Sequence, residues 1–97
     1  MIPWYAIIFT MNKQAILRDL QKIPGVGKSI SEDLFTIDIH SVKELRGKNP
    51  ENLYRELCKK QGVQIDRCML YVLRCAVYYA SHEKPKKESL LWWNWKD

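Results

Sequence analysis

The sequence predicts an all-α fold in which five helices pack into one compact domain. Apolar residues recur every three or four positions along most of the chain, which is the period of an amphipathic helix. Residues that start and end helices separate these segments, and no segment alternates apolar and polar residues as a half-buried strand does. The chain has 97 residues, of which 46% are hydrophobic and 28% charged. This length and balance predict a single folded domain without a β-sheet.

The first two helices are expected on either side of a turn at Pro24. Asn12 can cap the first helix. One face of that helix carries the apolar residues Ile16, Leu17, Leu20 and Ile23. Because proline disfavours helical geometry in the residue before it, the first helix should end at Ile23. The second helix should run over about 28–35 and present its apolar residues on one face.

A short third helix is expected to follow Ser41. Ser41 and Glu44 have the spacing of a capping box, in which each side chain can accept a hydrogen bond from an unpaired backbone amide. Gly47 then suits the position just past a helix end. We therefore expect one or two helical turns between these residues.

The fourth helix is expected over roughly 50–61. Asn49 can cap it, and Pro50 suits the first helical position. Gly62 suits a left-handed C-terminal cap, and Val63 can supply the apolar contact that often accompanies such a cap.

The last long helix is expected to be the central element of the core. Asp66 can cap its N-terminus, and Ile65 and Leu70 occupy the positions of a hydrophobic staple. Apolar residues then surround much of the helix, which is typical of a buried helix. The residues that we expect to build the core are Ile16, Leu20, Ile30, Leu34, Leu45, Leu53, Leu57, Leu70, Leu73 and Val77.

The domain itself is expected over residues 12–82. Met11 can serve as a start residue, which would make residues 1–11 an extension outside the fold. The segment 83–97 reads as a solvated linker followed by a tail that contains Trp92, Trp93 and Trp95. Because exposed tryptophans are costly, we favour a tail that packs on the domain. The alternative is a tail that binds a protein partner or stacks on unpaired bases.

Charge and cysteine content limit the partners, the thiol chemistry and the cellular compartment that we expect. The formal net charge is +5 and is spread along the chain, which permits a polyanionic partner. Cys58, Cys68 and Cys75 are an odd number without a C-x-x-C pair, so we expect reduced core residues with no disulfide and no zinc. Residues 1–10 have the features of neither an export signal nor a membrane anchor. We expect a cytoplasmic protein without a cofactor.

The stretch LxxIPGVGK at 20–28 joins the first two helices through a turn bracketed by glycines. Glycine lets a backbone approach a phosphate closely, and the free amides at the start of a helix attract anions. This stretch resembles the helix-hairpin-helix motif. The residues that we expect to contact DNA phosphates are Gly25, Val26, Gly27, Lys28 and Ser29. None of these contacts reads a base, so binding should be independent of sequence.

The resemblance to the motif also implies a monovalent cation at the turn. In such motifs hairpin carbonyls often hold a cation that bridges to phosphate, and Ile23 and Gly25 would supply these carbonyls here. The alternative is that the turn only packs two helices together. The chain would then be a protein–protein interaction module with a degenerate hairpin.

Residues 12–97 resemble the pathogenicity-locus family of small bacterial helix-hairpin-helix proteins, a family linked to mitomycin resistance. The stretches that carry this resemblance are IPGVGKSI at 23–30, SVxxLRG at 41–47, LYxxLC at 53–58, DRCxLYVxRCAVYYA at 66–80 and WWNWKD at 92–97. The resemblance implies a helical domain of SAM-like shape and a role with DNA, in repair or damage resistance.

We expect no enzymatic activity. A domain of this size has little room for an enclosed catalytic cavity. Asp66 resembles the catalytic aspartate that helix-hairpin-helix glycosylases place after the hairpin, but its position as a helix cap explains it, and the chain lacks a second domain to enclose a flipped base. Since one hairpin binds DNA weakly, a protein partner or a homodimer is expected to assist.

Overall fold

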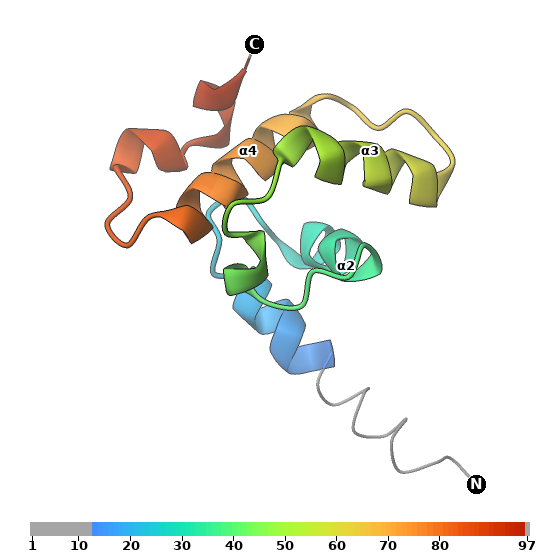
Figure 1. Ribbon diagram of the computed structural model, residues 1–97, viewed down its shortest axis with the longest axis horizontal. Coiled ribbons are helices and arrows are strands. Elements are labelled where there is room, and N and C mark those ends of the chain that lie inside the picture. The colour runs from blue at the N-terminus through green and yellow to red at the C-terminus, as the bar shows by residue number, and fades with distance from the viewer. Residues whose placement is uncertain (1–12, 97) are drawn as a thin grey trace, which may run out of the picture.

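The structure, a computed structural model, describes residues 13–96. The expected extension over 1–11 and the cap Asn12 lie outside these residues. The elements are a first helix over 13–20, α2 (Lys28–Thr36), η1 (Val42–Leu45), α3 (Pro50–Gln61), α4 (Cys68–Ser81), η2 (Lys87–Leu90) and η3 (Trp92–Trp95) (Figure 1). All regular elements in this part of the chain are helical, which confirms the all-α class. Four are α-helices, because the expected third helix is a single 3₁₀ turn, η1.

The helix α4 is the centre of the core, as the sequence predicts. It lies between α3 on one side and the C-terminal turns η2 and η3 on the other, and it also packs against η1 (Figure 1). Seven of the ten expected core residues are buried, namely Leu20, Leu34, Leu45, Leu53, Leu57, Leu70 and Leu73. The other three, Ile16, Ile30 and Val77, are half-buried and pack against this cluster.

Residues outside helices also contribute to the core. Val26 in the turn before α2 is buried, as are Ile37 and Ile39 after that helix. Helical spacing does not reveal these three residues, because a turn has no fixed period. Tyr54, which lies within α3, is buried as well, and its hydroxyl donates a hydrogen bond to the Ile65 carbonyl.

The first helix ends at Leu20, three residues before the expected end at Ile23. The chain tightens into successive turns, in which the Ile23 amide donates to the Leu20 carbonyl at 3.2 Å and the Val26 amide to the Ile23 carbonyl at 3.0 Å. Such i to i+3 bonds are common at helix ends, and the restriction that Pro24 places on Ile23 favours them here.

The capping box expected at η1 does not form. The Ser41 side chain makes no cap hydrogen bond, and the Glu44 carboxylate accepts from the His40 amide. The first amide of η1, that of Val42, donates instead to Oδ2 of Asp19 in the first helix, at 2.9 Å. This bond lowers the pKa of the Asp19 carboxyl below its ordinary value. A tertiary contact has replaced the local one.

The helix α3 has the expected ends. Oδ1 of Asn49 accepts from the amides of Glu51 and Asn52 at 2.9 and 3.3 Å, and Pro50 is the first helical residue. Gly62 adopts the left-handed conformation with φ +69°, and its amide donates to the Cys58 carbonyl at 2.9 Å. The apolar contact expected from Val63 was wrong, because this side chain is 59% exposed.

The helix α4 begins at Cys68, and Oδ1 of Asp66 accepts the Cys68 amide at 2.8 Å. This bond lowers the pKa of Asp66 and confirms its role as a cap. The three cysteines are free thiols, but only Cys75 is buried, while Cys58 is half-buried. The expectation that Cys68 is a core residue was wrong, since the first turn of α4 leaves it exposed beside Asp66.

Candidate nucleic-acid interface

The hairpin turn holds its two glycines in different conformations. Gly25 has φ +85°, which other residues adopt only with strain. Gly27 precedes α2 in an extended conformation with φ −94° and ψ −166°. A Cβ atom added at Gly27 would meet nothing within 4 Å. The backbone at Gly27 is therefore open to an approaching ligand.

The N-terminus of α2 adjoins this open backbone. No side chain in the described part of the chain caps it, and its first turn contains no acidic residue. The first amides of a helix have no partner inside the helix, and they lie at the positive end of its dipole. Lys28 and Ser29, the first two residues of α2, are both exposed. Amides, an ammonium and a hydroxyl thus share one end of the helix, which suits a phosphate.

Ser31 fixes α2 against the first helix. Its side chain is fully buried, and its hydroxyl donates to the Lys28 carbonyl at 2.7 Å and accepts from Nε2 of Gln21 at 3.4 Å. Because this side chain is fully buried, a larger residue here would have to displace its neighbours. The contact holds the turn and the start of α2 in one arrangement.

The five residues predicted to contact phosphate do not all face outward. Gly25, Gly27, Lys28 and Ser29 are exposed, whereas the Val26 side chain is buried and its amide donates to the Ile23 carbonyl. Val26 therefore supports the turn from inside. The Ile23 carbonyl keeps a second lone pair, which is the one that a bridging cation would use.

The C-terminal tail packs against the hairpin, which confirms the packed arrangement favoured from the sequence. A Cβ at Gly25 would lie 3.4 Å from Cδ1 of Trp92. Trp92 also packs against the core cluster. The sequence gives no sign that this particular residue meets the turn.

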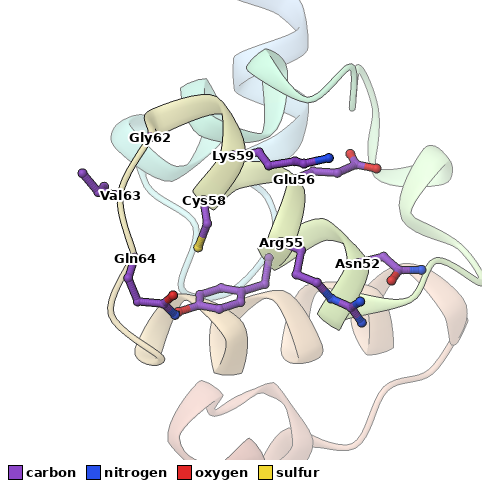
Figure 2. A pocket seen from close by; sticks show the side chains of 9 residues that line it. Asn52, Arg55, Glu56, Cys58, Lys59, Gly62, Val63 and Gln64 are labelled. Carbon is purple, nitrogen blue, oxygen red and sulfur yellow. The ribbon is translucent and has the colours of Figure 1, made fainter.

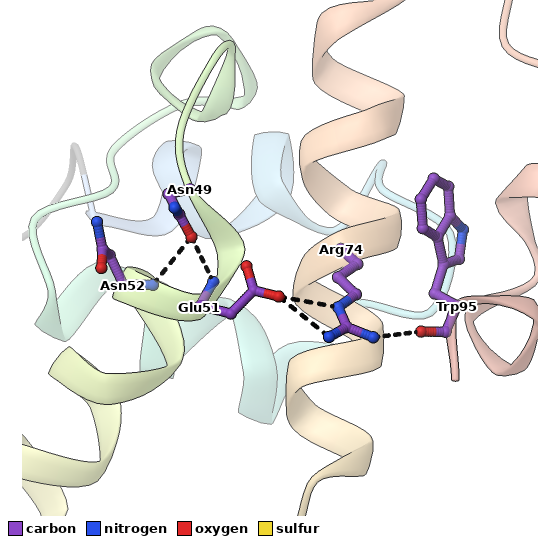
Figure 3. A network of polar contacts seen from close by, with 5 residues as sticks. All are labelled: Asn49, Glu51, Asn52, Arg74 and Trp95. Carbon is purple, nitrogen blue, oxygen red and sulfur yellow. Dashed lines mark hydrogen bonds and ion pairs between the residues drawn. The ribbon is translucent and has the colours of Figure 1, made fainter. Parts of the chain in front are cut away.

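One arginine holds the tail in place. Arg74 of α4 donates to Oε1 of Glu51 from Nε and Nη2, at 3.3 and 3.0 Å, and to the Trp95 carbonyl from Nη1, at 2.7 Å (Figure 3). The Trp95 indole donates to the Ser89 carbonyl at 2.8 Å. The start of α3, α4 and the tail thus meet at Arg74.

A basic hollow of about 570 Å³ lies between the end of the first helix and η1. Lys22, Lys43 and Arg46 line it, together with the single carboxylate of Asp19. That carboxylate pairs with Lys22 at 3.2 Å and accepts the Val42 amide, so the hollow keeps a net positive charge. Lys22 directly precedes the hairpin. The sequence did not reveal this group, because its cations come from separate segments.

A second hollow, about 670 Å³, lies beside α3 and the loop that follows it (Figure 2). Gln64 donates to the Tyr54 hydroxyl at 3.0 Å, and the Cys58 thiol points toward the same space. Burial raises the pKa of the Tyr54 hydroxyl. Among residues 13–96 no group of three or more histidine, cysteine or carboxylate side chains is placed to hold a metal ion.

A family model described as pathogenicity locus matches residues 13–97, almost the whole chain. The chain belongs to the pathogenicity locus family. This assignment confirms the resemblance drawn from the sequence.

A curated relative is similar to this member of the pathogenicity locus family. It is the mitomycin resistance protein McrB of Streptomyces lavendulae, 28% identical over 81 residues that cover 75% of this chain and 77% of the relative. No solved structure matches the chain. In the part that the structure describes, no helix is long and apolar enough to cross a membrane.

Proposed function

We propose that this pathogenicity locus protein binds the DNA backbone without sequence preference. The single observation that carries the proposal is the uncapped N-terminus of α2, which adjoins open backbone at Gly27 and the exposed side chains of Lys28 and Ser29. In this proposal the turn is a helix-hairpin-helix motif in a domain of SAM-like shape. The helix amides and Lys28 bind phosphate oxygens, and a cation at the Ile23 and Gly25 carbonyls would neutralise further phosphate charge.

The basic hollow supports the same function. Lys22, Lys43 and Arg46 lie on the side of the first helix that leads into the hairpin. A backbone that binds at the turn can continue toward these cations, which would add phosphate contacts without adding base contacts. The Streptomyces relative is named a mitomycin resistance protein, and we extend this name to a role of the present chain in damage resistance or DNA repair. We place this role in the cytoplasm, where thiols such as the free ones here stay reduced.

A second candidate function is the docking of a protein partner. Val63, 59% exposed, lies at the rim of the hollow beside α3, which Arg55, Glu56 and Lys59 also line (Figure 2). An exposed apolar residue with polar neighbours is typical of a docking edge. In this case the hairpin would serve only to pack the first helix on α2.

Fluorescence anisotropy with labelled single-stranded, duplex and branched DNA across a salt series tests the first proposal. A Kd of roughly 10⁻⁴–10⁻⁶ M is expected near physiological salt. With about two to four neutralised phosphates, log K should fall against log salt with a slope of roughly −2 to −3.5 on duplex DNA. Lys28→Glu should abolish measurable binding, because it places a negative charge at the phosphate site.

Lys60→Glu is the matched control, since it makes the same charge change on an exposed residue of α3 away from the hairpin. It should weaken binding only slightly. If Lys28→Glu stays folded by circular dichroism and binds every DNA form as the parent does, the hairpin is only a packing element and protein docking becomes the leading function.

A further inference from the structure

We propose that the hairpin and Trp93 form one site for DNA that contains unpaired bases, with phosphate on the turn and a base stacked on the Trp93 indole. This inference rests on the proposed function and names its substrate class. The tail brings the two parts together, because Trp92 contacts Gly25 and the neighbouring Trp93 packs edge-on against Trp92, with ring centroids 5.7 Å apart.

Trp93 differs from its two neighbours in the tail. Trp92 and Trp95 are half-buried, whereas Trp93 is 48% exposed. Exposure of a large apolar ring to water is unfavourable. Beside a phosphate site, this exposure is explained if the ring stacks on a base of the ligand. Indole rings bind bases by stacking on either exposed face, without regard to base identity.

Hydrogen bonds fix the backbone of the residues next to Trp93. The Asn94 amide donates to the Leu91 carbonyl at 2.9 Å, and the Asn94 side chain donates to the Glu88 carbonyl at 2.8 Å. Two residues after Trp93, the Trp95 carbonyl accepts a hydrogen bond from Arg74. An aromatic ring on a fixed backbone loses little freedom on binding, so it is preorganised for stacking.

Charge favours a nucleic acid over an apolar protein partner at this place. Four exposed lysines and two exposed glutamates lie along the same tail, namely Lys84, Lys86, Lys87, Lys96, Glu83 and Glu88. The described tail is therefore basic, and the hairpin beside it adds Lys28. Sites for single strands usually combine an aromatic ring with a basic surface, and the described tail and hairpin carry both.

The expected ligand is unpaired because duplex bases are already stacked on each other. A base in a single strand, a gap or a branch has a free face for Trp93, and the neighbouring phosphate can then lie on the hairpin. Duplex DNA would lack the contact with Trp93. The protein should therefore bind an unpaired strand more tightly than a duplex of equal length.

The test compares Trp93→Ala with the parent by anisotropy on a labelled oligothymidylate strand and on a duplex of equal length, at one salt concentration. Trp93→Ala should weaken single-strand binding about 5- to 100-fold, the range for loss of one stacked base, and should change duplex binding by less than about twofold. Trp93→Phe, which keeps an aromatic face, should restore most of the single-strand affinity. Val63→Ala, at another exposed apolar residue, should change neither.

A spectroscopic signal supplements the affinities. Addition of the oligothymidylate should quench the tryptophan emission of the parent, and Trp93→Phe should lose most of this quenching while it still binds. Circular dichroism checks that each variant is folded, which is expected because the Trp93 side chain is half in solvent.

The outcomes separate this inference from the proposed function. If Lys28→Glu removes binding but Trp93→Ala keeps the parent ratio of single-strand to duplex affinity, the stacking site is overturned and the hairpin function stands. Equal losses on both DNA forms with Trp93→Ala also overturn the stacking site. If the parent binds neither form, both proposals fail, and a change in self-association with Trp93→Ala would then assign the ring to a protein contact.

Discussion

Gly25 and Gly27 lie two positions apart in the turn, yet they serve different purposes. Gly25 is needed for the fold, because its φ of +85° is strained for any residue that has a Cβ, although a Cβ there would make only an ordinary contact with Trp92. Gly27 has an extended backbone with open space beside it, so its lack of a side chain matters only to a ligand. The sequence shows both as glycine and cannot tell these roles apart.

Substitutions at the two glycines should therefore affect different properties, stability at Gly25 and DNA binding at Gly27. Gly25→Ala should lower the free energy of unfolding by about 1–2 kcal/mol, the cost of a left-handed conformation for a residue with a Cβ. Gly27→Val should lower the free energy of unfolding by no more than about 1 kcal/mol, because Gly27 is the N-cap of α2 and valine caps helices less well, while it blocks phosphate from the backbone and weakens DNA binding at least tenfold. Urea unfolding and anisotropy measure the two effects. A Gly27→Val protein that binds DNA normally would show that phosphate does not approach this backbone.

At the scale of elements, the segments predicted best are those whose signals lie within a few residues. The ends of α3 are predicted correctly because Asn49, Pro50 and Gly62 act on the helix that they bound. The start of η1 is not, because its first amide pairs with Asp19 from the first helix. A capping box describes only local donors and acceptors, so it cannot show that a distant carboxylate supplies a better partner.

Asp19 should make stability depend on pH. Its pKa is lowered from 3.8 in the folded protein, chiefly by the Val42 amide, so its stabilisation is complete above 3.8 and is lost as pH falls through the lower folded value. Asp19→Ala should lower the free energy of unfolding by about 1 kcal/mol at pH 7, as the loss of a cap does. Urea midpoints of parent and variant should converge in the acid range. A difference that stays constant with pH would mean that the Asp19 charge is unimportant.

For the whole molecule, the sequence predicts the all-α class and the central position of α4, because a helix that is apolar on most sides must be covered. It also favours a packed tail. It does not predict which elements the tail joins, since the contacts of Trp92 with Gly25 and of Arg74 with Trp95 link residues far apart in the chain. The candidate site therefore follows from the sequence as a turn, but its aromatic and basic neighbours follow only from the fold.

Arg74 should control how firmly the tail is docked. Arg74→Gln removes the ion pair with Glu51 and the charged hydrogen bond to the Trp95 carbonyl, and it should lower the free energy of unfolding by about 1–2 kcal/mol. The amides of residues 87–96 should then exchange with deuterium faster than those of α3. Single-strand affinity should fall toward the duplex value, with duplex binding unchanged. Parent-like exchange across the tail would contradict this role for Arg74.

The contact of Trp92 with Gly25 also bears on how the chain matures during synthesis. The ribosome completes the hairpin early, but α4 and the tail emerge last, at about 5–20 residues per second. Until then the turn lacks its neighbour Trp92. A nascent chain thus spends seconds with the hairpin residues synthesised and the indole surface absent. Discrimination between unpaired and paired DNA would be acquired only at the final step of folding.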